Sequence, residues 1–174
     1  MRSHLIAALG AACLLLAAPL ANAQDKPTDP QIAHIAYSAG LIDIEAAKLA
    51  LTKTETKAVT EFAQSMQKDH EAVNEQALAL VKKLNVTPED NATSQALAKA
   101  AEEKRAELAR LDGAAFDKAY IDNEVAYHAA VNDSLAALLI PSAHDAELKA
   151  LLETGLTLFT EHQHHAEMVA GDLQ

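Results

Sequence analysis

The chain has 174 residues, a length that suits one domain; half of them are hydrophobic and only 3% are aromatic. With few glycines and prolines, this composition is typical of an all-helical protein with close helix contacts. The formal net charge is −11 and no positively charged stripe is present, which argues against nucleic acid as a partner.

Residues 1–23 have the three parts of a secretory signal peptide. Arg2 gives a basic start, residues 5–20 are an apolar run, and Ala21-Asn22-Ala23 is a small-x-small cleavage site. The apolar run is too short for a comfortable transmembrane helix, so we expect cleavage and no membrane span.

Cleavage near Ala23 would leave residues 24–28 as a polar linker and residues 29–174 as the folded domain, in the periplasm or outside the cell. A lipoprotein anchored through Cys13 is the alternative. Gly10 argues against it, because a lipid-attachment box normally has an aliphatic residue at that place.

The first two helices are predicted from capping signals. Asp29 and Pro30 predict a helix start, with Asp29 as N-cap and Pro30 at the first helical position. That helix should end near Lys53, where a threonine-rich stretch interrupts the pattern. Thr54 is the predicted N-cap of a second helix that ends near Lys83.

A loop at residues 85–94 precedes a shorter, polar helix at residues 96–111, which Asp112-Gly113 ends. The next long helix is predicted from about Ala115 to Leu139, and Pro141 should stop it.

Ser142-Ala143-His144-Asp145 resembles a capping box and opens the last helix, which should reach about Ala170, with Gly171 ending it. No stretch alternates like a strand. The sequence therefore predicts an all-α fold: an antiparallel four-helix bundle with one additional shorter helix.

Three of these helices carry histidine inside their apolar stripe. On a helix, residues three or four apart share a face, so His70, His128, His162 and His165 are predicted to point at the core. A buried imidazole needs a hydrogen bond, a carboxylate or a metal as its partner. The predicted stripes are Val59, Phe62, Met66, His70, Val73, Ala77 and Leu80; Ile121, Val125, His128, Val131, Leu135 and Leu138; and Leu148, Leu151, Gly155, Leu158, His162, His165 and Val169.

Neutral imidazoles suit zinc, copper and iron, so these histidines predict a transition-metal site if their helices are neighbours. Glu124 lies one turn before His128, which in an antiparallel pair is the level of the histidines of the last helix. The predicted metal ligands are His70, His128, His162, His165, Glu124, Asp43, Glu45 and Asp69.

The paired Glu-x-x-His motif of di-iron bundles is incomplete. Glu161 and His164 have the right spacing, but His164 points away from the apolar stripe, and Glu124 and His128 are one residue too far apart. No nucleophile–base–acid set occurs either, so the sequence does not favour an enzyme. A purely structural polar layer and a pH sensor are the other interpretations of the histidines.

Several motifs together resemble the secreted bacterial family catalogued as domain of unknown function four-one-four-two. The resemblance covers about residues 29–169 and implies a ferritin-like helical bundle without an established activity. The family's histidine positions fall on the same imidazoles that the apolar stripes select. At Asp43, however, the family usually has Glu. The motifs are Asp43-Ile44-Glu45, Phe62-Ala63-x-x-Met66-x-x-Asp69-His70, Phe116-Asp117-x-x-Tyr120, His128 and His162-x-x-His165-Ala166.

The sequence thus favours a secreted or periplasmic bundle that binds a transition metal, without a nucleic-acid partner. The alternative is a cell-envelope stress or interaction protein with purely structural histidines. A metal-oxidising or peroxide-handling enzyme is the third hypothesis.

Overall fold

The computed structural model describes residues 26–173. The predicted signal peptide, the linker up to residue 25 and the alternative lipid site Cys13 lie outside these residues. The described part is helical apart from its connecting loops, and none of its helices is long and apolar enough to cross a membrane. The helices are α1 (Asp29–Lys53), α2 (Lys57–Leu84), α3 (Ala92–Leu108), α4 (Gly113–Ser134), the π-helix η1 (Leu135–Leu139), α5 (Ile140–Ser142) and α6 (Ala146–Asp172).

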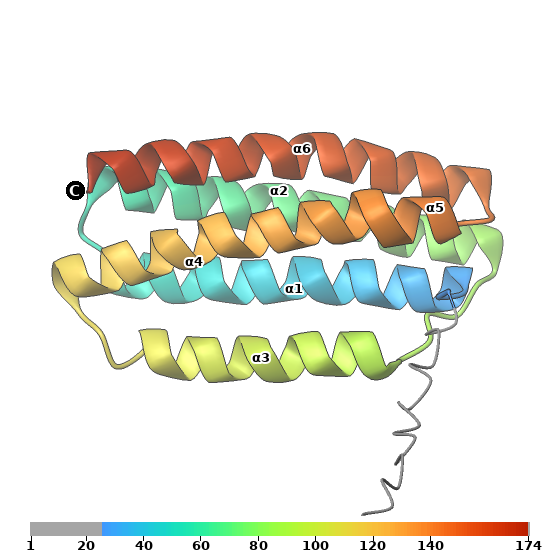
Figure 1. The fold of residues 1–174 in the computed structure, drawn as a ribbon, viewed down its shortest axis with the longest axis horizontal. Coiled ribbons are helices and arrows are strands. Elements are labelled where there is room, and N and C mark those ends of the chain that lie inside the picture. Colours follow the sequence, from blue (N-terminus) through green and yellow to red (C-terminus); the bar gives the residue numbers. More distant parts are fainter. Residues whose placement is uncertain (1–25, 174) are drawn as a thin grey trace, which may run out of the picture.

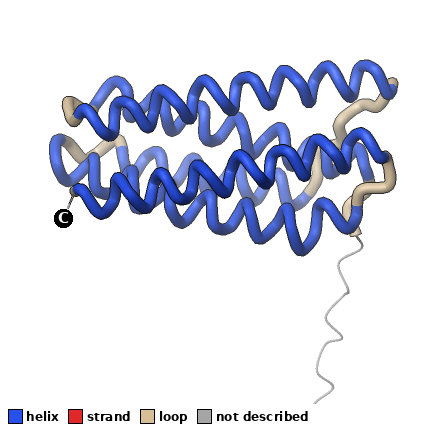
Figure 2. Tube along the Cα trace, turned by 90° about the horizontal axis from the view of Figure 1, so that it is seen from above, coloured by secondary structure: helices blue, strands red, loops and turns tan. Residues whose placement is uncertain are grey.

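Helices α1, α2, α4 and α6 form a four-helix bundle, and α3 packs on its outside against α1 (Figure 1). Helix α3 carries the chain back along the bundle, so α2 and α4 run in the same direction (Figure 1). The loops gather at the two ends of the molecule (Figure 2). This arrangement confirms the predicted bundle with one shorter helix, and its single long crossover is the connection that ferritin-like bundles use.

The starts of the first two helices differ from the predictions. The N-cap of α1 is Thr28, not Asp29, and the Asp29 carboxylate instead accepts hydrogen bonds from the backbone of His144 and Asp145 at 2.8 and 2.9 Å. The N-cap of α2 is Thr56 rather than Thr54. The Thr56 hydroxyl donates to Asp117 of α4, so a contact between distant segments fixes this boundary.

Helix α3 begins four residues before the predicted position. The Asn91 side chain accepts from the backbone N–H groups of Thr93 and Ser94, both at 3.1 Å, and the Ser94 hydroxyl accepts from the Asn91 N–H at 3.1 Å. This reciprocal cap is the capping-box arrangement with Asn and Ser in its two places. It starts the helix at Ala92 and leaves a shorter loop than predicted.

The helix predicted to stop at Pro141 continues past it. Helix α4 is followed without a break by a wider, π-helical turn that lies before the proline. The π-helix η1 precedes the proline, and Pro141 lies inside the short helix α5. In a regular α-helix the proline ring would clash with the carbonyl of residue 137, and a wider turn relieves that clash. The last helix is then capped by Asp145, not Ser142, and it continues through Gly171.

The core has two apolar halves. One half contains the bulky side chains Phe62, Met66, Phe116, Tyr120 and Ile121, all fully buried. The other half is built on aliphatic side chains and one aromatic ring: Ile32, Ile35, Leu135, Leu139, Leu148, Leu152 and Phe159. Buried polar residues from the four long helices lie between these halves, at the level where the predicted histidines meet.

Candidate metal centre

Three histidines from three helices meet inside the bundle. His70 of α2, His128 of α4 and His162 of α6 have ring centroids 5.3 to 5.7 Å apart. Their exposed fractions are 3%, 1% and 5%. Each helix presents its imidazole because apolar residues one turn away on the same face are buried in the core. The structure therefore brings these three predicted residues together.

The carboxylate of Asp43, from α1, is the fourth member of the cluster. Its Oδ2 atom lies 3.1 Å from His70 Nε2 and 3.2 Å from His128 Nε2, and the residue is 1% exposed. Neither contact has the alignment of a hydrogen bond, and neither carboxylate oxygen has a hydrogen-bond partner. A buried carboxylate in such surroundings is costly unless something else compensates its charge.

Two of the imidazoles are held from outside the cluster. His128 donates through Nδ1 to the Glu124 carbonyl at 3.0 Å, and His162 donates through Nε2 to Asp69 Oδ2 at 3.1 Å. These bonds leave the lone pairs on His128 Nε2 and His162 Nδ1, and both atoms are buried without a hydrogen bond. Metal-binding histidines in proteins are commonly oriented in this way.

Glu124 lies beside the cluster and is 1% exposed. Its Oε2 atom is 3.7 Å from His128 Nδ1, and Asn123 donates to its Oε1 at 3.4 Å. Burial, and then the negative charge of Asp43, raise the pKa of Glu124 well above its ordinary value. Both effects favour the protonated, neutral form of the Glu124 carboxyl group in the metal-free protein.

Asp43 is the ionised group of the cluster. Burial opposes ionisation of Asp43, but the neighbouring imidazoles, His70 first, outweigh it and lower its pKa. Burial lowers the pKa of His128 and, together with the nearby His70, lowers the pKa of His162 to about 4 despite the hydrogen bond to Asp69. At neutral pH the Asp43 carboxylate thus lies in one cluster with neutral His128 and His162 rings, whose free lone pairs can bind a cation.

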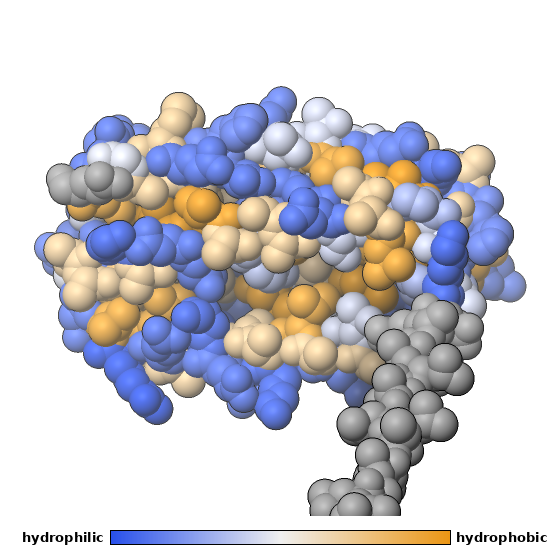
Figure 3. Space-filling view, viewed as in Figure 1, coloured by the Kyte–Doolittle hydropathy of each residue, from blue (hydrophilic) through white to orange (hydrophobic). Residues whose placement is uncertain are grey.

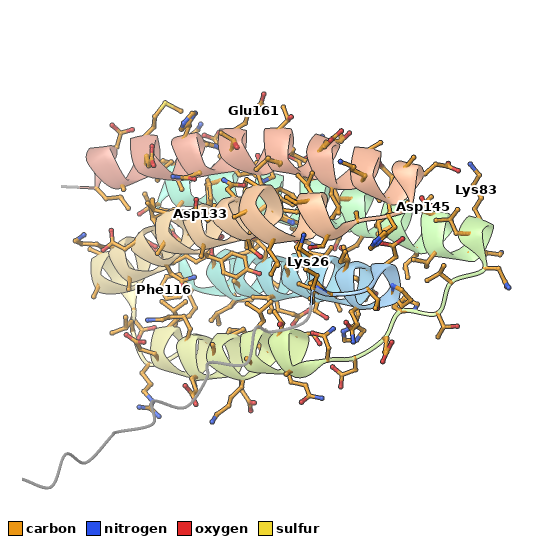
Figure 4. All side chains as sticks on the ribbon, turned by 45° about the vertical axis from the view of Figure 1, so that its right-hand side comes forward. Lys26, Lys83, Phe116, Asp133, Asp145 and Glu161 are labelled. Carbon is orange, nitrogen blue, oxygen red and sulfur yellow. The ribbon has the colours of Figure 1, made fainter. Side chains whose placement is uncertain are left out.

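Two predicted ligands lie outside the cluster. Glu45 is exposed and pairs with Lys48 at 3.2 Å. His165 is half-buried and packs edge-on against Phe62, with ring centroids 5.1 Å apart. The incomplete Glu-x-x-His motif also lies outside, because Glu161 projects away from the bundle and His164 is exposed (Figure 4).

The position of His165 follows from the buried face of α6. The sequence predicts a stripe through Leu151, Leu158 and His165, whereas the structure buries Leu152, Phe159 and Ala166 at those levels. Both stripes share Leu148, Gly155, His162 and Val169, so helical spacing alone allowed either. In the structure, the buried face of α6 is therefore rotated slightly from the predicted one. It includes His162 but not His165.

The cluster also uses residues that the sequence did not single out. The Phe159 ring stacks on His70, with centroids 4.7 Å apart and planes 13° apart. Asn132 of α4 donates to the Phe159 carbonyl at 3.3 Å and to Gln163 at 3.0 Å, which ties α4 to α6 next to the site. Phe159 precedes His162 by three residues, so both lie on one face of α6. This spacing is the sequence signal that could have placed Phe159 at the cluster.

The donor set fits a transition-metal ion. His70, His128 and His162 form one group of ligand atoms within 4.8 Å of one another, and Asp43, Glu124 and His128 form a second. Two ligand atoms about 2.1 Å from one ion are about 3.0 to 3.4 Å apart in octahedral or tetrahedral geometry. The distances from Asp43 Oδ2 to the two imidazoles lie in that range.

Comparisons with known proteins agree with the resemblance drawn from the motifs. A search of curated proteins and a search of solved structures found no match to this chain. The model of one family matches residues 15–169, which include all of the residues of the cluster. The chain therefore belongs to the family described as a domain of unknown function, DUF4142.

Proposed function

We propose that this protein binds one divalent transition-metal ion through Asp43, His70, His128 and His162. The observation that carries the proposal is the pair of outer hydrogen bonds. They leave one buried lone pair on His128 Nε2, which lies 3.2 Å from Asp43 Oδ2, and one on His162 Nδ1, whose ring lies beside those of His70 and His128. A polar layer that served only to connect the helices would satisfy these atoms with hydrogen bonds.

The ligand chemistry limits the choice of ion. Three imidazole nitrogens and one carboxylate oxygen suit the borderline ions Zn²⁺, Cu²⁺ and Fe²⁺. Neither of the two ligand groups contains a cysteine, so a soft ion such as Cu⁺ fits less well. Glu124 supplies a further carboxyl group, which could join as a fifth ligand once it loses its proton.

The site would serve metal binding in the periplasm or outside the cell. Support comes from the signal-peptide pattern of residues 1–23 and from the absence of cysteine after residue 23, which suits an oxidising compartment. N-terminal sequencing of the protein from its native host tests this part, with a mature end at Gln24 as the expected result.

The metal proposal is tested on protein purified without a histidine tag. After dialysis against Zn²⁺, Cu²⁺ or Fe²⁺, elemental analysis should find one ion per chain for at least one of them. The same ion should raise the melting temperature, because a ligand that binds only the folded state stabilises it.

The matched variants are His162→Gln and His165→Gln, three residues apart on α6. The first should lose the bound ion and the thermal shift, while the second should keep both, because His165 packs against Phe62 outside the cluster. A metal-free protein whose melting temperature ignores all three ions would favour the purely structural role of the histidines. Two ions per chain would instead point to a paired site that includes Glu124.

A further inference from the structure

An apolar cavity lies beside the histidine cluster, in the aliphatic half of the core. It has a volume of about 170 Å³ and is lined by α1, α2, α3, α4, η1 and α6. Small side chains on facing helices leave the space, among them Ala36, Ala77 and Ala130. In the other half of the core, the bulky rings of Phe62, Phe116 and Tyr120 occupy the corresponding interior.

The lining is almost entirely hydrocarbon, and its polar groups at the inner wall are already used. Asn74 donates to the Tyr37 carbonyl at 3.4 Å, and the Tyr127 hydroxyl donates to the Ala39 carbonyl at 2.8 Å. A water molecule needs two to four polar partners, and this wall offers few. The cavity therefore suits an apolar guest better than water.

The cavity has an entrance and a connection to the cluster. Among its lining residues Ala130 is exposed and Thr93 is half-buried, and apolar surface is visible between α4 and α3 (Figure 3). At the inner end, Phe159 lines the cavity and also stacks on His70. A bound molecule would thus lie one aromatic ring away from the histidine cluster.

The helix geometry around the cavity is also unusual. Leu135 and Leu139, the first and last residues of the π-helix η1, both line it. π-Helical turns are rare and occur frequently at functional sites. The local widening of the helix therefore shapes this wall.

From these observations we infer that the cavity is a binding site for a small, neutral, apolar molecule of about the size of benzene. Cavities of about 150 Å³ lined by leucine, isoleucine and phenylalanine bind benzene or xenon. The site is separate from the proposed metal centre, because its walls include none of the four proposed ligands.

The experiment is a benzene titration of the EDTA-treated protein, followed by the NMR signals of its side-chain methyl groups. We expect saturable shifts at Leu135, Leu139 and Leu152, which line the cavity, and none at Met66 in the other half of the core. Phenol, which has the same shape and a hydroxyl group, should bind more weakly because the inner wall has few free partners for it.

Two alanine-to-leucine substitutions in α2 test the site, one inside the cavity and one on the surface as its control. Ala77 lines the cavity and Ala79 is exposed, so Ala77→Leu should weaken benzene binding at least tenfold and Ala79→Leu should not change it. Absence of saturation in the wild-type protein, shifts spread over the surface, or equal binding by the two variants would overturn the inference. Because the protein is metal-free, such a result would leave the metal proposal standing.

Discussion

The pH dependence of folding gives a quantitative test of the environment of His162. Its pKa is about 4 in the folded protein, against 6.5 for an ordinary histidine, because it is buried and lies beside His70. At about 1.4 kcal/mol per pKa unit, this difference corresponds to about 3 kcal/mol of folding free energy.

The sign follows from which state binds the proton. Between pH 6.5 and pH 4 the unfolded chain is protonated at His162 while the folded protein is not, so protons favour unfolding. The contribution of His162 to the stability of the fold is fully present above pH 6.5 and is lost as the pH falls to about 4. The lowered pKa of His128 acts in the same direction. The raised pKa of Glu124 acts in the opposite direction, since it favours folding as the pH falls.

The assay is urea unfolding of EDTA-treated protein at half-unit steps from pH 4 to pH 7, for the wild type and His162→Gln. Because Glu124 and His128 are present in both proteins, the difference between the two curves isolates His162. The wild type should lose about 3 kcal/mol more than the variant over this range. The exposed His144→Gln should follow the wild type. Parallel wild-type and His162→Gln curves would refute the assigned environment.

Four further single substitutions have expected outcomes. Asp69→Asn should weaken metal binding about 10- to 100-fold, with the stoichiometry unchanged, because the carboxylate orients the His162 ring. Titration calorimetry measures both quantities. Equal affinity would show that this hydrogen bond has no orienting role. Glu124→Gln should change the stability of the metal-free protein at pH 7 by no more than about 1 kcal/mol, since burial favours the neutral form of the carboxyl group and glutamine is its neutral counterpart. A much larger loss would mean that the carboxyl group is ionised. Gly40→Ala should destabilise the protein by about 1 to 3 kcal/mol, because its Cβ would lie 2.3 Å from the Asn74 side-chain oxygen. Gly171→Ala, where a Cβ meets nothing within 4 Å, should stabilise it by up to about 1 kcal/mol, and chemical unfolding compares the two; similar effects at both positions would contradict the close approach of α1 and α2.

The fold could be predicted from the sequence because the helices are long and no stretch alternates like a strand. The boundary of α2 was predicted wrongly because a contact between distant segments decides it. Thr56, rather than Thr54, begins α2 because its hydroxyl reaches Asp117, which is far away in the sequence. Local capping rules cannot detect such a bond. The start of α3 at Asn91 was detectable, since Asn and Ser stand three residues apart in a capping-box pattern.

The cluster was predictable only in part. His70, His128 and His162 follow from helical spacing, because polar residues within an apolar stripe point inward. Asp43 was predicted as an oxygen ligand from its place on the small-residue side of the first helix. Spacing could not separate His162 from His165, since rotating α6 by a fraction of a turn exchanges one stripe for the other. The apolar cavity could not be predicted at all. Its volume depends on how side chains from six helical segments fill one space.

The most direct test of the metal centre is X-ray absorption spectroscopy of the zinc-loaded protein. The proposed site predicts three imidazole nitrogens and one carboxylate oxygen at about 2.0 to 2.2 Å from the ion, and loss of the bound zinc in His162→Gln. A zinc ion surrounded only by oxygen, or a spectrum that His162→Gln leaves unchanged, would contradict the proposal that these buried side chains hold the metal.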